Sequence, residues 1–90
     1  MATKEKLPHP PILWLLKRVF DPAKDRRTDV TNGLVVCAAS SRKARDIASE
    51  HRGDEGSEVW LDYKQSTCEI IGMGQSGSKA GLILQDYHHG

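Results

Sequence analysis

The 90-residue sequence has no apolar run long enough to cross a membrane, almost no excess of charge of either sign, and few aromatic residues or cysteines. Its main apolar runs, Ile12–Leu16 and Leu34–Ala39, are far shorter than the roughly 20 residues that a membrane-spanning helix needs. The formal net charge is +1, so no bulk electrostatic field attracts nucleic acid or an anionic membrane. Prolines rather than a long apolar stretch follow the first residues, so we expect no signal peptide and a cytoplasmic location.

The two cysteines, Cys37 and Cys68, have no second Cys or His at the spacing of metal ligands. We expect both to be free thiols buried in strands, with an interstrand disulfide as the alternative. The sequence also lacks the Gly-x-Ser-x-Gly and His-Glu-x-x-His signatures, and a chain of this length has little room for a cleft. We therefore expect no catalytic residues, no metal site and no cofactor, and a protein that is not an enzyme.

The residues that are present predict one small domain. Three of the four prolines lie in residues 1–11, which we expect to be a flexible lead-in to a domain over residues 12–90. The helix should begin at Ser40 or Ser41, because a serine oxygen can cap it. The apolar runs predict four strands, at Ile12–Phe20, Leu34–Ala39, Ser66–Ile71 and Gly81–Tyr87. This order predicts an α+β fold, a two-layer ββαββ domain with a mainly antiparallel sheet and one helix on one face.

Several connections carry turn signals. The polar segment Asp21–Asn32 ends on Asn32-Gly33, a strong turn dipeptide. Gly53 is expected to end the helix in a left-handed conformation, and Arg52 suits the negative end of the helix dipole. Two strand orders, 2-1-3-4 and 1-2-4-3, both satisfy the rules for crossovers and hairpins.

The first expected strand is apolar on both faces. Trp14 and Leu16 point to one side, whereas Leu13 and Leu15 point to the other. A single helix covers only one face of a sheet, so the second apolar face indicates a central strand or a contact surface. We expect Leu13, Trp14 and Leu15 to form an interface, and the chain to be a homo-oligomer, a dimer joined through this strand.

The expected start of the helix is cationic, with Arg42, Lys43 and Arg45 in its first turns. A helix N-terminus carries partial positive charge, so this cluster is either a tolerated surface feature or a prepared anion site. In an anion site, a phosphate or carboxylate would bind Ser41, Arg42, Lys43 and Arg45. Trp60 would then stack on the ligand; its alternative role is a lid over the core.

Three blocks resemble short proteins of unknown function that bacteriophages and prophages encode. These are the strand–helix Leu34–Ala48 with its Ala44-Arg45 pair, the run from Val59-Trp-Leu-Asp to Ser66-Thr-Cys-Glu, and the closing strand Gly81–Tyr87. The resemblance brings no assigned activity and no site residues. It implies a small protein of a mobile element in the cytoplasm of a bacterial host, where many such proteins bind and disable host components.

The function that we expect is therefore a small interaction module. It would bind a host protein and occlude it, as host-takeover and counter-defence proteins do. The alternative is a protein that sequesters a small anionic, nucleotide-like ligand through the cationic helix start. A nucleic-acid partner is disfavoured by the near-zero net charge, and no membrane partner is expected.

Overall fold

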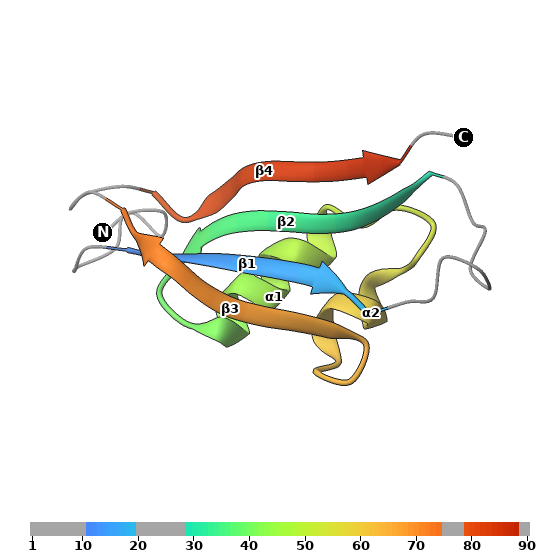
Figure 1. Cartoon of the computed structure of the whole chain (residues 1–90), viewed down its shortest axis with the longest axis horizontal. Coiled ribbons are helices and arrows are strands. Elements are labelled where there is room, and N and C mark those ends of the chain that lie inside the picture. The colour runs from blue at the N-terminus through green and yellow to red at the C-terminus, as the bar shows by residue number, and fades with distance from the viewer. Residues whose placement is uncertain (1–10, 20–28, 75–78, 89–90) are drawn as a thin grey trace, which may run out of the picture.

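Four strands and two helices make up the part of the chain that the structure describes, residues 11–19, 29–74 and 79–88 of a computed structural model. The elements follow the order β1 (Ile12–Arg18), β2 (Val30–Ala38), α1 (Ser41–Glu50), α2 (Ser57–Leu61), β3 (Ser66–Met73) and β4 (Gly81–His88). The strands form one antiparallel sheet, and both helices lie behind it in Figure 1. The expected α+β two-layer fold is confirmed. The expected lead-in and most of the Asp21–Asn32 segment lie outside the described residues.

The strand order is β3-β1-β2-β4, so both expected orders are wrong. Both orders placed β3 beside β4, its neighbour in sequence, whereas β3 pairs with β1 and β4 pairs with β2 on the opposite edge. Consecutive strands are neighbours in only about two-thirds of cases. Here the β1–β2 pair has two open edges, and β3 and β4 occupy one edge each. β1 is therefore a central strand, as one interpretation of its two apolar faces required.

The sheet alternates between a covered face and an open one. Trp14 and Leu16 of β1 are buried on the helix side, while Leu13 and Leu15 lie on the other side and are only half-buried. Trp14 pairs with Val36 and Leu16 with Leu34, and directly paired residues share a face. The buried core beneath the helices consists of Trp14, Leu16, Leu34, Val36, Ala38, Ala44, Ala48, Val59 and Trp60.

Helix α1 begins where the sequence predicts. Ser40 is its N-cap, and the Ser40 hydroxyl accepts a hydrogen bond from the backbone N–H of Lys43 at 3.2 Å. Ala44 and Ala48 are fully buried, and their small side chains let the helix lie close to the sheet. Arg52 donates to the carbonyl of Ser49 at the helix end, at 3.0 Å.

The expected role of Gly53 is wrong. The helix ends at Glu50, with His51 as its C-cap, and Gly53 does not have a positive φ. A Cβ atom on Gly53 would collide with the carbonyl oxygen of Asp29 and lie 3.0 Å from the Tyr87 ring. Glycine is needed here because the loop after α1 presses against the start of β2, where Asp54 N–H donates to the Asp29 carbonyl at 2.7 Å.

The turn expected at Asn32-Gly33 is also wrong, because β2 already begins at Val30 and runs through both residues. The pairing of β2 with β4 shifts between Thr31 and Gly33, which makes Asn32 part of a bulge. Asn32 Oδ1 accepts a hydrogen bond from the Arg18 guanidinium at 2.7 Å. The Asn-Gly pair thus supplies an irregularity inside a strand rather than a turn between two strands.

The second helix, α2, was not expected. It is a short helix over Ser57–Leu61 that buries Val59 and Trp60 and leaves Leu61 half exposed. Five residues are too few for an apolar period of 3.6 to be recognised in the sequence.

Within the described ranges, no helix is long and apolar enough to span a membrane.

Candidate interaction surface

The five residues of the expected anion site do not come together. Ser41, Arg42 and Lys43 lie exposed on the first turn of α1, where no acidic side chain is present. Arg45 and Trp60 instead make contacts inside the protein, described below. The exposed first turn therefore carries two cationic side chains but lacks the aromatic group that the ligand-binding hypothesis required.

Arg45 ties α1 to the start of β3. One guanidinium nitrogen donates to the Trp60 carbonyl at 2.9 Å and to the Ser66 hydroxyl at 2.8 Å, and the other donates to the Ser66 carbonyl at 3.1 Å. Ser66 is fully buried, so these bonds satisfy polar groups that water does not reach. The fork of Arg45 is thus occupied by a structural role, and the sequence pattern alone did not reveal it.

Trp60 is fully buried, as the lid alternative required, and it is anchored by Glu55. Trp60 Nε1 donates to Glu55 Oε2 at 2.6 Å. The other carboxylate oxygen accepts from the backbone N–H groups of Thr31 and Gly53, both at 2.9 Å. Glu55 is itself buried and joins β2, the loop after α1 and α2. In this arrangement Trp60 has no surface on which a ligand can stack.

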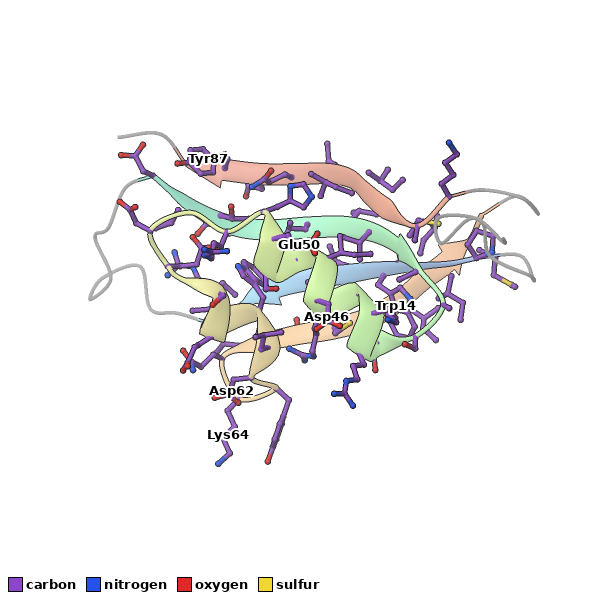
Figure 2. All side chains as sticks on the ribbon, turned by 180° about the vertical axis from the view of Figure 1, so that it is seen from behind. Trp14, Asp46, Glu50, Asp62, Lys64 and Tyr87 are labelled. Carbon is purple, nitrogen blue, oxygen red and sulfur yellow. The ribbon has the colours of Figure 1, made fainter. Side chains whose placement is uncertain are left out.

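The interface expected at Leu13, Trp14 and Leu15 divides between the two faces. Trp14 is buried at 8% exposure and donates from Nε1 to the Ala38 carbonyl at 3.1 Å, so it belongs to the core. Figure 2, viewed from the helix side, shows it beside α1. Including Trp14 in the interface was therefore wrong, because neighbouring residues of a strand point to opposite faces. Leu13 and Leu15 remain on the open face.

The open face of the sheet is the side without helices, and its residues form three rows across the strands. We define the open face by the first row Thr67, Lys17, Gly33 and Asp86, the second row Glu69, Leu15, Val35 and Leu84, and the third row Gly72, Leu13, Cys37 and Gly81, of which Cys37 is itself buried. The middle of the face is apolar, and the charged residues stand at one end and one edge. Leu84 is 66% exposed on the edge strand β4. Among the described residues, no helix covers this face (Figure 1).

A hollow lies in the first row of the open face. It encloses about 190 Å³ around Gly33, where the absence of a side chain leaves a gap between Lys17 and Asp86. Leu15, Val35 and Leu84 form its apolar wall. A space of this kind takes one side chain of a partner surface.

The cysteines are free thiols, as expected, with Cys37 buried and Cys68 half-buried. Burial raises the pKa of both thiols, and for Cys68 the positive charge of Arg45 opposes this effect. Raised pKa values disfavour the reactive thiolate.

Across residues 11–19, 29–74 and 79–88, no group of three or more His, Cys, Asp or Glu residues is arranged to hold a metal ion.

Comparisons with known proteins give no match to a family model, to a curated protein or to a solved structure. The resemblance to bacteriophage and prophage proteins therefore stays a prediction.

Proposed function

We propose that the protein is a non-catalytic interaction module and that the open face of its sheet is the surface with which it contacts other proteins. The observation that carries this proposal is the contrast between the two faces of one sheet. The helix side buries a core that includes two tryptophans, whereas the opposite side carries the half-buried Leu13, Leu15 and Val35 and the exposed Leu84, without a covering layer among the described residues. Apolar patches of this kind mark contact surfaces.

The charged residues give the open face a polar border. Lys17 and Asp86 stand at one end, and Glu69 stands at the β3 edge. Protein interfaces typically join an apolar centre to a polar rim in this way. The border sets the orientation of a partner, while burial of the leucines and valine supplies the free energy of binding.

The partner class follows from the resemblance rather than from the surface. A host protein in a bacterial cytoplasm, occluded by the bound module in host takeover or counter-defence, is the partner that we propose. A small anionic ligand has less support, since Arg45 and Trp60 are engaged within the protein.

The experiment compares two Leu→Glu variants on opposite sides of the molecule. Leu84 lies on the open face and is 66% exposed, and Leu61 lies on α2 and is 50% exposed, so neither charge is forced into the core. The immobilised protein is incubated with bacterial lysate, and each retained protein is then purified and titrated. A partner bound by the parent and by Leu61→Glu but not by Leu84→Glu supports the proposal. Equal binding by all three proteins refutes the open face as the contact surface.

A thermal-shift series with cyclic and linear nucleotides tests the rival function. A ligand that binds the native state raises the melting temperature by mass action. An interaction module of the proposed kind shows no shift, whereas a shift abolished by Arg42→Glu would favour the sequestering function.

A further inference from the structure

The charges in the first row of the open face make it self-complementary. It carries a cation at Lys17, a position without a side chain at Gly33 and an anion at Asp86, on three adjacent strands. Lys17 and Asp86 are both exposed. When a second copy faces the first, its Asp86 and the hollow at its Gly33 can lie opposite Lys17 of the first copy.

We propose that, when no other partner is present, two copies of the protein pack open face to open face, with Lys17 of each copy in the Gly33 hollow of the other and paired with Asp86 there. The inference rests on the proposed function, because it uses the same surface. Another partner would then have to displace the second copy.

The geometry follows from one symmetry operation. A two-fold axis parallel to the strands, midway between β1 and β2, lays β1 of each copy over β2 of the other and keeps every residue in its own row. Leu15 then lies over Val35, and Lys17 lies over Gly33. Packed sheets are about 10 Å apart, so a long side chain fits best opposite a residue that has none. Because the operation is two-fold, every contact occurs twice.

The area suits a dimer that forms and dissociates. Four strands about 4.8 Å apart and roughly 25 Å long give each copy a face on the order of 500 Å². Two such faces bury about 1,000 Å² in total, which is near the lower limit for a specific interface. An exchanging dimer of this size leaves the open face accessible to a competing partner.

Charge reversal on each side of the contact tests the arrangement. In the Lys17→Asp dimer, the introduced aspartate of each copy faces Asp86 of the other copy. In the Asp86→Lys dimer, the introduced lysine of each copy faces Lys17 of the other copy. Each variant alone should dimerise roughly tenfold or more weakly than the parent, because attraction becomes repulsion at both contacts. Lys43→Asp makes the same charge change on the helix side and should dimerise like the parent.

Mixing the two variants gives the decisive result. In the mixed dimer, Asp at position 17 meets Lys at position 86, and the unchanged Lys17 meets the unchanged Asp86. Sedimentation of the equimolar mixture should therefore recover the dimer that each variant has lost, an effect that no ion pair within one chain can produce. Circular dichroism establishes that the variants are folded. If one of them unfolds, the neutral variants Lys17→Gln and Asp86→Asn replace the pair and should each weaken the dimer by a smaller factor.

Two results would overturn the inference. One is a parent protein that stays monomeric at hundreds of micromolar. The other is a dimer that the charge reversals leave unchanged, or that mixing does not restore. Neither result touches the proposed function, which fails separately if Leu84→Glu retains the same partner as the parent.

Discussion

Glu55→Gln tests whether a buried carboxylate fixes the helix layer on the sheet. The carboxylate accepts three hydrogen bonds, from the backbone N–H groups of Thr31 and Gly53 and from Trp60 Nε1. A glutamine has one acceptor oxygen and one NH₂ group, so at least one of the donors must face another donor. A buried donor left unsatisfied costs about 1–3 kcal/mol, and the loss of charge assistance adds to this. We expect a loss of about 2 kcal/mol in the free energy of unfolding.

Thermal and urea unfolding at one fixed protein concentration measure the effect, because self-association would make the melting temperature depend on concentration. For a domain of this size, 2 kcal/mol lowers the melting temperature by about 8–16 °C. Glu58→Gln is the matched control, since Glu58 is exposed in the first turn of α2; loss of its charge there costs at most about 0.3–1 kcal/mol, so this variant should melt closer to the parent than Glu55→Gln does. Glu55→Ala leaves all three donors without the carboxylate and should lose more than Glu55→Gln. A Glu55→Gln protein as stable as the parent would refute the structural role of the carboxylate.

Three further predictions follow from buried or hydrogen-bonded groups. Ala44→Leu or Ala48→Leu should each lower the free energy of unfolding by about 1–3 kcal/mol, since both positions are fully buried; variants that melt like the parent would contradict the close helix–sheet packing. Hydrogen bonds from the Lys64 N–H and the Gln65 side chain hold the pKa of Asp62 below its ordinary value of about 3.9. The contribution of this carboxylate is therefore complete above that value and is lost as the pH falls through the lowered pKa, so Asp62→Asn should be less stable than the parent at neutral pH and equal to it in strong acid. Cys37 should resist a thiol reagent in the native protein and react on unfolding; rapid labelling of the native thiol would show that its burial is transient.

The sequence predicted the elements whose pattern is local. The alternation in Ile12–Leu16 indicated correctly that Trp14 and Leu16 share one face of the sheet and that Leu13 and Leu15 share the other. Ser40 was one of two expected caps, and it is the one that the structure uses. These features depend on the period of an element and on a cap within three residues, so neighbouring residues are enough to specify them.

The features that sequence reasoning missed depend on contacts between distant segments. The separation of β3 and β4 onto opposite edges of the β1–β2 pair is a choice between two open edges, and no pattern within either strand records it. Gly53 is a residue type that commonly ends helices. Glycine is required at this position, however, because a Cβ atom would collide with the carbonyl oxygen of Asp29, 24 residues earlier in the sequence. Trp60 was recognised as either a lid or a ligand contact, and the choice between them depended on Glu55, an ordinary charged residue in the sequence.

The most direct test that two copies meet through the open face is a nuclear Overhauser measurement on a mixed sample, in which half of the molecules carry isotope-labelled methyl groups. The account predicts contacts between Leu15 methyls of one molecule and Val35 methyls of the other, which weaken on dilution. Methyl groups of the core, such as those of Ala44 and Ala48, should show none. Intermolecular contacts confined to α2 or to the outer edge of β4, with none at Leu15, would contradict the account.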